Sequence, residues 1–405
     1  MKPTFMGDGP QGSGFSRCGF LNVMPPVLDR KHPSAADLEQ AAHRRLPEFV
    51  WEYLYCGMGH GDAVKRNRHA LDRIKLVPRH LVGSDETDMR TEFLGQTFSA
   101  PFGVAPVGLG GLAWPHSAES LARAAGEQAI PFVASTFAMA SLETLYDCAG
   151  PCAWFQLYRP NVETIEEDLL HRAETTGYDV LLVTVDVPAP MRRDHDIRNG
   201  FSVPVRFDHR KLWQAALHPQ WTFAMAREGF PSFQNLLPYI PNSLKGNDAL
   251  HYLSDITTGH VTPGILRRLR KRWNGKLLVK GVLSPREAAM CQDLGVDGIV
   301  VSNHGGRQLA AAPAPCDMIR AIRSATGSDF ALIADGGVRN GLDIARLLFL
   351  GADFVMMGRP FYYAVAALGH QGARYIMEIF KKEFKGTLAQ LGCRTVGELG
   401  MLKAG

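Results

Sequence analysis

Short apolar segments alternate with segments of helical character along most of the chain after residue 100. Val, Phe, Ile and Leu dominate the apolar segments, each of which has the length of a buried strand. Apolar residues at consecutive positions are typical of parallel strands that helices cover on both faces. The segments are Phe102–Pro106, Phe132–Ser135, Trp154–Tyr158, Val180–Asp186, Leu277–Gly281, Gly298–Asn303, Phe330–Asp335 and Phe354–Gly358.

The segments between these strands carry signals of helix starts and ends. Ser284 precedes Pro285 and Glu287, which combines a cap, a first-turn proline and a first-turn acid. Gly295 and Gly351 stand where a helix needs a left-handed residue before the next strand. Eight strands alternating with helices predict an α/β fold, the (β/α)8 TIM barrel.

A doubly wound open sheet is the rival architecture. It is disfavoured because no GxGxxG follows the first strand and because polar residues or glycines end almost every strand. Barrel enzymes build their active sites from the carboxyl ends of many strands. The residues at these ends are Gly108, Ser135, Gln156, Tyr158, Thr184, Asp186, Lys280, Ser302, His304, Asp335, Gly358 and Arg359.

Two regions fall outside the repeat. Residues 187–262, after the fourth strand, form an insertion rich in aromatic residues, Pro and Gly, on the side where a site is expected. We expect a lid or an oligomer contact there, with membrane association as a weaker alternative. Residues 34–75 read as a helical segment capped by Ser34. The chain thus divides into a flexible extension, residues 1–33, and a single barrel domain, residues 34–405.

Composition and charge exclude several classes of protein. Among 405 residues, 46% are hydrophobic and 21% charged, which excludes disordered and fibrous chains. A net charge of +4 gives no sign of a nucleic-acid surface. No apolar run is long enough for a transmembrane segment, and the N-terminal residues lack the apolar core of a signal peptide. The 7 scattered cysteines predict reduced thiols in a cytoplasmic protein and no metal site.

The strongest candidate for chemistry lies in residues 300–309, VVSNHGGRQL. His304 and Arg307 stand in a glycine-containing loop directly after a strand. An imidazole suits proton abstraction near neutral pH, and a guanidinium binds a carboxylate through two hydrogen bonds. A single histidine is usually a core or surface residue, but the position at a strand end beside Arg307 favours a site.

Two further features indicate a bound group with a phosphate and a ring. Residues 335–339, DGGVR, and residues 358–360, GRP, supply glycines and arginines after strands seven and eight, where barrels commonly bind phosphate. Lys280 ends the fifth strand and faces the barrel mouth. It could form a Schiff base or place a fixed positive charge beside an electron-accepting ring, and the residues alone do not separate the two.

These motifs resemble the FMN-dependent 2-hydroxy-acid dehydrogenase/oxidase family, which includes glycolate oxidase, lactate oxidase, flavin lactate dehydrogenase and mandelate dehydrogenase. The resemblance rests on SNHGGRQL, DGGVRNG, GRP, WFQLY, TVD and LVKG and runs from about Leu46 to Arg394. The stretches APVGLGG and HPQW resemble the bacterial L-lactate dehydrogenase branch most. The resemblance implies FMN as cofactor and oxidation of a lactate- or mandelate-like 2-hydroxy acid to the 2-oxo acid.

The resemblance also implies residue roles. His304 is similar to the family's base and Asp186 to its carboxylate partner. Four residues match the substrate site: Tyr53, Tyr158, Arg193 and Arg307. Lys280 matches the lysine whose charge stabilises the reduced flavin, which argues against a Schiff base. The positions matching the flavin ring and ribityl chain are Pro106, Val107, Gly108, Ser135, Gln156, Thr184 and Ser302. Those matching the ribityl and phosphate end are Asp335, Gly336, Gly337, Val338, Arg339, Gly358 and Arg359.

The departures from the family pattern concern the substrate and the acceptor. Gly108 stands where the oxidases carry Ala, which favours a quinone or an electron carrier over O2 as acceptor and leaves O2 open. Met191 and Ala310 replace the usual Gly and Asp on the substrate side. An alternative is therefore a biosynthetic member that oxidises a larger or amine-bearing substrate by oxidative deamination or decarboxylation. Phe137 and Phe155, near the expected pocket, do not separate lactate from mandelate.

A third hypothesis is a flavin-binding protein without turnover. The set of His304, Asp186, Arg307 and Arg193 argues against it, because a non-catalytic barrel does not need that set. For partners, we expect a homo-oligomer, a tetramer as in the family, with no nucleic acid. For location, we expect the cytoplasm, with peripheral attachment to the inner face of the membrane as a further option.

Overall fold

The structure is a computed structural model that describes residues 26–82, 86–189, 192–201, 207–229, 232–241, 243–244, 247–257 and 259–402. Met191 and residues 1–25 of the predicted extension lie outside the described residues. The remainder of that extension does not behave as a free tail. Residues 26–31 form a helix, and the Tyr375 hydroxyl donates to the His32 carbonyl at 2.9 Å. The described fold thus begins at residue 26 rather than at residue 34.

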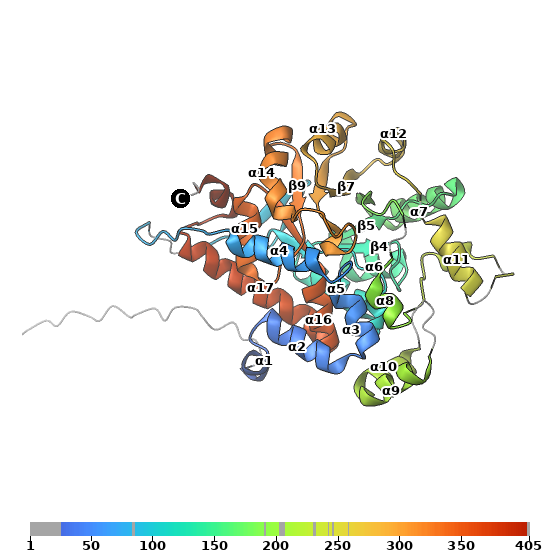
Figure 1. Ribbon diagram of the computed structural model, residues 1–405. Helices are drawn as coiled ribbons and strands as arrows, with labels where there is room; N and C mark the ends of the chain where they lie inside the picture. Colours follow the sequence, from blue (N-terminus) through green and yellow to red (C-terminus); the bar gives the residue numbers. More distant parts are fainter. Residues whose placement is uncertain are drawn as a thin grey trace, which may run out of the picture.

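A closed barrel of eight strands confirms the predicted fold class (Figure 1). Neighbouring strands pair in parallel throughout, in the order β10-β3-β4-β5-β6-β7-β8-β9. Each strand lies on one of the predicted apolar segments, with small differences at the ends. The strands are β3 (Phe102–Val104), β4 (Phe132–Ser135), β5 (Ala153–Leu157), β6 (Val180–Thr184), β7 (Lys276–Val282), β8 (Gly298–Val301), β9 (Ala331–Ala334) and β10 (Phe354–Met357).

Helices surround the barrel between successive strands. The predicted cap is present, since the Ser284 hydroxyl accepts from the Glu287 amide, and Gly295 takes a left-handed φ of 77°. The helices are α5 (Ser117–Glu127), α6 (Leu142–Ala149), α7 (Glu163–Thr176), α12 (Pro263–Arg272), α13 (Pro285–Asp293), α14 (Pro315–Thr326), α15 (Gly341–Phe349), α16 (Arg359–Leu368) and α17 (His370–Gln390).

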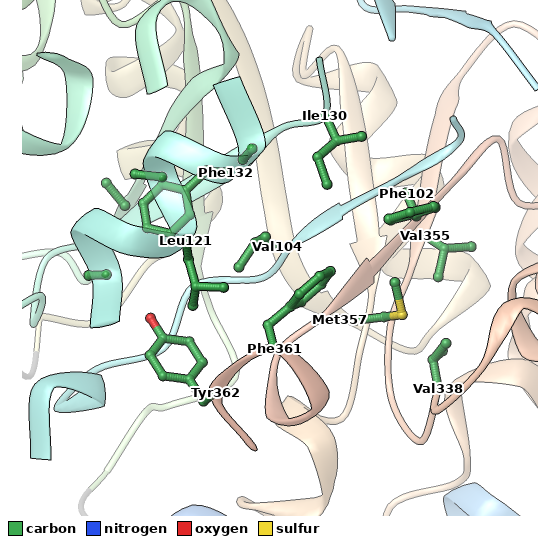
Figure 2. Close-up of a cluster of buried hydrophobic side chains, with 14 of the residues drawn as sticks. Phe102, Val104, Leu121, Ile130, Phe132, Val338, Val355, Met357, Phe361 and Tyr362 are labelled. Carbon is green, nitrogen blue, oxygen red and sulfur yellow. The ribbon is translucent and has the colours of Figure 1, made fainter. Parts of the chain in front are cut away.

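The main core lies between the barrel and these helices. Figure 2 shows one part of it, where Phe102, Val104 and Val355 of β3 and β10 face Leu121 of α5 and Phe361 of α16. These side chains are fully buried. Full burial of such a side chain contributes about 1.5–3 kcal/mol, so this layer fixes the strand ends that carry the polar residues.

An antiparallel hairpin of β1 (Thr91–Phe93) and β2 (Gln96–Phe98) was not predicted. It covers the amino end of the barrel, since Phe93 and Phe98 pack against Trp154 and Phe354 with ring centroids 4.9–6.3 Å apart. Each strand has only three residues, too few to show an alternating pattern. The hairpin leaves the carboxyl end of the barrel as the open end.

The segment predicted to be helical, residues 34–75, contains α2 (Ala35–Arg45), α3 (Glu48–Tyr55) and α4 (Asp62–Arg73), and α1 (Pro26–Lys31) precedes it. Ser34 caps α2 in a capping box with Asp37. The insertion after β6 holds α8 (Asp194–Arg198), α9 (His209–Leu217), α10 (Pro219–Glu228) and α11 (Asn247–Ile256). Figure 1 shows α9 and α10 on the same lower side of the molecule as α1. Among the described residues, no helix is long and apolar enough to cross a membrane.

Candidate active site

A cavity of about 500 Å³ opens at the carboxyl end of the barrel. The strand ends supply most of its wall, α3 adds Tyr53, and the insertion adds side chains on the outer side. Most of the predicted site residues meet in this one space. Those that line it are Tyr53, Pro106, Val107, Gly108, Tyr158, Arg193, Lys280, His304, Arg307, Asp335, Gly336, Gly337, Val338, Arg339, Gly358 and Arg359.

His304 is the centre of a hydrogen-bonded chain of three side chains. Its Nδ1 lies 3.0 Å from Asp186 Oδ1, and its Nε2 lies 3.2 Å from the Tyr158 hydroxyl. With Nδ1 occupied by the carboxylate, Nε2 is the nitrogen that faces the cavity. The three residues come from the ends of β8, β6 and β5, as predicted from the strand ends.

The backbone at His304 is strained, with φ at 57° in the left-handed region. Such a conformation costs a residue with a side chain about 1–3 kcal/mol and is held by its surroundings. Here the His304 amide donates to Ser302 Oγ at 3.0 Å. Asn303 and Asn67 of α4 also exchange two side-chain hydrogen bonds, at 2.9 and 2.7 Å. These contacts fix the direction of the imidazole.

The Asp186 carboxyl is ionised in this environment. Burial acts to raise its pKa, but the charge of His304, the hydrogen bond from it and the charge of Lys280 outweigh burial and leave the pKa below its usual value. Oδ2 of Asp186 is buried and has no hydrogen-bond partner among the described residues. The carboxylate therefore directs its negative charge at the His304 ring.

Arg307 is a partly buried cation without an ion pair to any described carboxylate. Its Nη1 donates to the carbonyls of Tyr53 and Cys56 at 2.6 and 3.0 Å, and its guanidinium lies 4.9 Å from the Tyr53 ring centroid. Burial lowers its pKa, and the charge of Arg193 acts in the same direction. Arg193 forms an ion pair with Asp196 at 3.7 Å. The two cations make this end of the cavity attractive to an anion.

Lys280 supplies a second buried positive charge. Its Nζ lies 3.1 Å from Asp335 Oδ2 and donates to Ser302 Oγ at 2.9 Å. Burial acts to lower its pKa, but Asp335 and Asp186 outweigh burial and raise it. Lys280 is therefore a charged ammonium group in the wall of the cavity. Such a state suits a fixed charge and does not suit a nucleophilic amine.

The remaining predicted residues lie behind the cavity wall. Ser135 Oγ donates to Gln156 Oε1, and Gln156 Nε2 donates to Thr184 Oγ1, each at 2.8 Å. Together with Ser302 and Asp186, these residues do not line the cavity itself. Ser135, Gln156 and Thr184 are buried and joined across β4, β5 and β6, so they form a polar layer behind the cavity wall.

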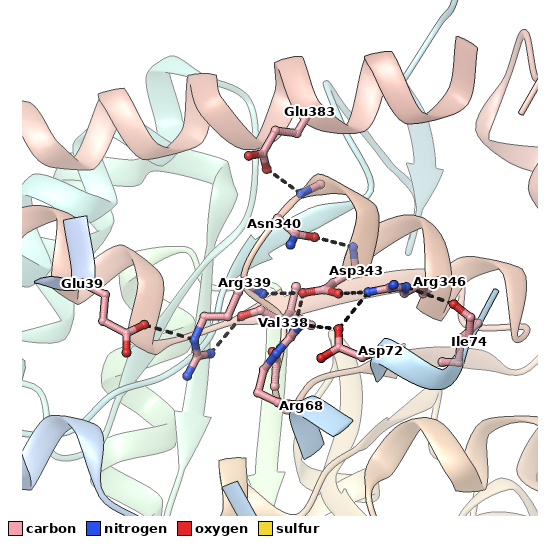
Figure 3. A network of polar contacts seen from close by, with 12 residues as sticks. Glu39, Arg68, Asp72, Ile74, Val338, Arg339, Asn340, Asp343, Arg346 and Glu383 are labelled. Carbon is pink, nitrogen blue, oxygen red and sulfur yellow. Dashed lines mark hydrogen bonds and ion pairs between the residues drawn. The ribbon is translucent and has the colours of Figure 1, made fainter. Parts of the chain in front are cut away.

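The opposite end of the cavity is cationic and held by a polar network. Figure 3 shows Asp343 of α15 between Arg68 and Arg346, with its Oδ2 accepting the Arg339 amide at 2.9 Å. Arg339 Nε is 3.7 Å from Glu39 Oε2, and within the described part of the chain Arg359 donates only to the backbone carbonyls of Leu54, Cys56 and Gly305. Burial lowers the pKa of Arg359 to about 10.

Several lining residues were not predicted. The insertion contributes Val187, Phe233, Leu253 and Thr257, which carry no periodic pattern in the sequence. Phe137 lines the cavity as expected. Phe155 does not, because its side chain is fully buried and lies 6.1 Å from the Tyr178 ring.

One group of potential metal ligands is also present among the described residues. The ligand atoms of Glu52, Cys56 and His195 lie within 4.8 Å of one another. Glu52 and His195 already contact each other at 3.3 Å, and burial raises the pKa of Cys56 to about 11. A protonated thiol is a poor ligand, so these residues join α3 to α8.

Comparison with known proteins identifies relatives along nearly the whole chain. The L-lactate dehydrogenase of Chromohalobacter salexigens is 34% identical over 368 residues, which cover 91% of this chain and 94% of that protein. The (S)-mandelate dehydrogenase of Pseudomonas putida is 36% identical over 363 residues, covering 90% and 91%. A crystal structure of the monotopic membrane protein (S)-mandelate dehydrogenase matches with a TM-score of 0.86 at 34% identity, covering 90% of this chain and 97% of that one.

The family model for FMN-dependent dehydrogenases matches residues 42–403. This match confirms the resemblance seen in the sequence motifs, and it spans both the barrel and the cavity residues. The chain is an FMN enzyme that belongs to the FMN-dependent dehydrogenase family.

Proposed function

We propose that this enzyme oxidises a lactate- or mandelate-like 2-hydroxy acid to the 2-oxo acid. The relatives named above are L-lactate and (S)-mandelate dehydrogenases. The observation that carries the proposal is the chain Asp186–His304–Tyr158, in which His304 and Tyr158 line the same cavity as Arg307, a cation without an ion pair to any described carboxylate. None of these relatives supports the alternative of an amine-bearing or larger substrate.

The cavity fits FMN in its donor set. Arg359 and the neighbouring Arg339 supply charge for a phosphate where Gly336, Gly337 and Gly358 line the wall. Oδ1 of Asp335 is buried and has no hydrogen-bond partner among the residues that the structure describes, as an acceptor for a ribityl hydroxyl would be. Lys280 and the layer of Ser135, Gln156, Thr184 and Ser302 would hold the ring end, over Pro106, Val107 and Gly108. When bound, FMN supplies a two-electron acceptor.

His304 would remove the proton from the substrate. Its Nε2 faces the cavity, and the ionised Asp186 on the other ring nitrogen stabilises the imidazolium that forms. The positive charge of the imidazolium also favours the Tyr158 hydroxyl, which lies next to it, as a hydrogen-bond donor toward a substrate oxygen. Burial and the charge of Asp186 raise the pKa of Tyr158, so this hydroxyl stays protonated.

Arg307 and Arg193 would hold the substrate carboxylate, with Tyr53 beside them. Among the described residues, Arg307 donates only to carbonyl oxygens, and it has hydrogen-bonding capacity left for a carboxylate. Asp196 acts on Arg307 only as a nearby charge, without a direct ion pair among the described residues, so a bound carboxylate would be the direct partner of this guanidinium. Anchoring the carboxylate here places the hydroxyl-bearing carbon near His304 Nε2.

The test is anaerobic bleaching of the bound flavin by a panel of 2-hydroxy acids. We expect bleaching by lactate or mandelate, and a loss of about 10²–10⁴-fold in rate for His304→Ala. His69→Ala, on the exposed side of α4, is the matched control. Arg307→Met should weaken substrate binding and keep the yellow colour. Full activity in His304→Ala, or loss of FMN from Arg307→Met, would contradict the assignment.

Gly108 bears on the electron acceptor, for which we propose a quinone or an electron carrier rather than O2. A Cβ at this position would lie 3.1 Å from the Phe137 Cβ, so the glycine keeps this part of the cavity wide. Oxygen readmission after anaerobic reduction separates the two cases. Slow reoxidation supports a dehydrogenase, and rapid stoichiometric formation of peroxide supports an oxidase.

We also propose peripheral attachment to a membrane through α9 and α10. Trp213 and Phe223 are 66% and 71% exposed, and Leu212 and Leu217 are exposed beside them. Exposed aromatic and aliphatic side chains on a helical hairpin suit the headgroup boundary of a bilayer. The structurally similar mandelate dehydrogenase is described as a monotopic membrane protein. A cytoplasmic location and a tetramer remain predictions.

A further inference from the structure

A second cavity, of about 370 Å³, lies where α1 and α2 meet the corner between α9 and α10. It is separate from the active site and shares no lining residue with it. Five of its lining side chains are basic or can become so: Lys31, His32, Arg44, Arg45 and His218. None of the described residues that line it carries a carboxylate. An unbalanced group of cations around a cavity is a site for an anion.

Arg45 is the fixed element of this cavity. Its Nη1 donates to the carbonyls of Ala366 and Ala367 at 3.1 and 2.8 Å, and its guanidinium lies 3.8 Å from the Trp114 ring centroid. Its Nε is buried and has no hydrogen-bond partner among the described residues. Burial lowers the pKa of Arg45, and no described carboxylate pairs with it. A rigid arginine with an unused donor is prepared to bind an anion.

Lys31 and Arg44 add two more cations without an ion pair to any described carboxylate. Burial lowers the pKa of His32, the charges of Lys31 and Arg44 act in the same direction, and Asp37 acts against them. The carboxylate of Asp37 is itself engaged in the Ser34 capping box. The potential in the cavity is therefore positive.

The rim of this cavity joins the exposed apolar surface of α9 and α10. Leu217 belongs to both, and His218 forms the corner between the helices, with Nδ1 held 2.7 Å from the Gln214 carbonyl. Trp213 on α9 and Phe223 on α10 are each five residues from His218 in the sequence, on either side of this corner. Figure 1 shows α1, α2, α9 and α10 along one side of the molecule. A basic cavity thus opens beside side chains suited to the bilayer boundary.

We propose that this cavity binds the phosphate of an anionic lipid headgroup while α9 and α10 enter the bilayer boundary. The proposal rests on the membrane attachment proposed above and adds a lipid preference to it. A phosphate diester offers oxygen acceptors to Arg45, Arg44 and Lys31, and it needs no metal. Basic residues near an anionic membrane contribute attraction that adds up over the residues involved.

The experiment is flotation of the FMN-loaded enzyme with vesicles of phosphatidylcholine alone or with phosphatidylglycerol added. We expect binding to rise with phosphatidylglycerol. The double variant Lys31→Gln/Arg44→Gln should lose about tenfold or more of that binding, with unchanged turnover. Arg210→Gln/Arg227→Gln, on α9 and α10, removes the same charge outside the cavity and is the matched control.

The outcomes separate the cavity from the attachment itself. An equal loss of binding to phosphatidylglycerol vesicles in both double variants would overturn the proposal that the cavity binds the headgroup. It would show instead that any positive charge on this side of the protein contributes equally. No flotation of the wild type with either vesicle would overturn the attachment. Trp213→Ser/Phe223→Ser should reduce flotation with both vesicles while the phosphatidylglycerol preference remains. Tight calorimetric binding of inorganic phosphate that Lys31→Gln/Arg44→Gln abolishes, with vesicle binding intact, would make this a site for a soluble phosphate and overturn the lipid assignment.

Discussion

His304 Nδ1 lies 3.0 Å from Asp186 Oδ1, and this contact joins the ends of two strands that are far apart in the sequence. Asp186→Asn keeps the size of the side chain and removes its charge. We expect kcat/KM to fall about 10²–10⁴-fold, because the imidazolium loses its stabilising partner. Steady-state kinetics with the preferred 2-hydroxy acid measures the loss.

The ionisation of Asp186 has a defined direction with pH. Its pKa lies below its usual value of about 3.9, so the carboxylate should stay charged over about pH 5–9 and lose its charge only in more acidic solution. NMR titration of the isotope-labelled carboxyl carbon in the holoenzyme measures this directly. Protonation of Asp186 within that window would contradict its place beside His304 and Lys280.

Lys280 should set the reduction potential of the flavin. Its raised pKa keeps the ammonium charged up to a pH above the usual value of about 10.4. We expect Lys280→Met to lower the potential by about 30–60 mV, since about 30 mV corresponds to 1.4 kcal/mol for two electrons. Spectroelectrochemistry of the holoenzyme gives the value.

Two variants separate the charge of Lys280 from its packing. The reduction potential of the flavin in Lys280→Arg should lie closer to the wild-type value than the potential in Lys280→Met. Lys276→Met removes a lysine at the other end of β7, where it pairs with Asp297 at the surface, and should leave the potential unchanged. A potential equal to wild type in Lys280→Met would place the lysine away from the ring.

Arg359 should discriminate FMN from riboflavin. The guanidinium is partly buried, burial lowers its pKa to about 10, and among the described residues it donates only to carbonyl oxygens, so a phosphate would be its first strong counter-ion. A hydrogen bond between charged groups contributes about 1.5–3 kcal/mol. Arg359→Gln should then weaken FMN about ten- to a hundredfold and leave riboflavin unchanged, as measured by flavin fluorescence with the apoprotein. Arg374→Gln, exposed on α17, is the control. Equal weakening of both flavins would argue for a structural role.

The strand ends made much of the site predictable from the sequence. Parallel strands of a barrel finish at the same end, so residues such as Lys280 and Asp335 had to approach each other once their strands were identified. The structure adds the contact between them, at 3.1 Å. The sequence did not predict which of these residues line the cavity and which lie in the polar layer behind its wall. The side of a strand end that faces the cavity depends on local twist. Ser135 and Gln156 therefore lie behind the cavity wall.

The parts that escaped prediction depend on contacts distant in the sequence. Phe233 and Leu253 reach the cavity from an insertion whose path is set by packing rather than by periodicity. Asn67 supports the His304 loop from α4, across a separation in sequence of 236 residues. An asparagine on a helix is ordinarily exposed. The one local signal for Asn67 was its position on the buried face of α4, together with Ala63, Ala70 and Leu71.

Glu52 joins the insertion to the substrate end of the cavity. Its carboxylate lies 3.3 Å from His195 Nδ1 and also accepts a hydrogen bond from Asn199. The next residue, Tyr53, stacks on Phe201 with ring centroids 4.6 Å apart. Helix α8 is thereby held against α3, which positions the adjacent Arg193.

Glu52→Gln should weaken this junction without removing its hydrogen-bonding capacity. We expect KM for the 2-hydroxy acid to rise about three- to tenfold, the effect of about 0.7–1.4 kcal/mol for a half-buried ion pair. The maximal rate of flavin reduction should change much less, because His304 and Asp186 lie on the barrel rather than on α8. Glu48→Gln, on the same helix and paired only with the exposed His43, is the matched control. A fall in the maximal rate of Glu52→Gln with an unchanged KM would place Glu52 in the chemical step. Equal KM values in Glu52→Gln and Glu48→Gln would show that the junction does not position Arg193.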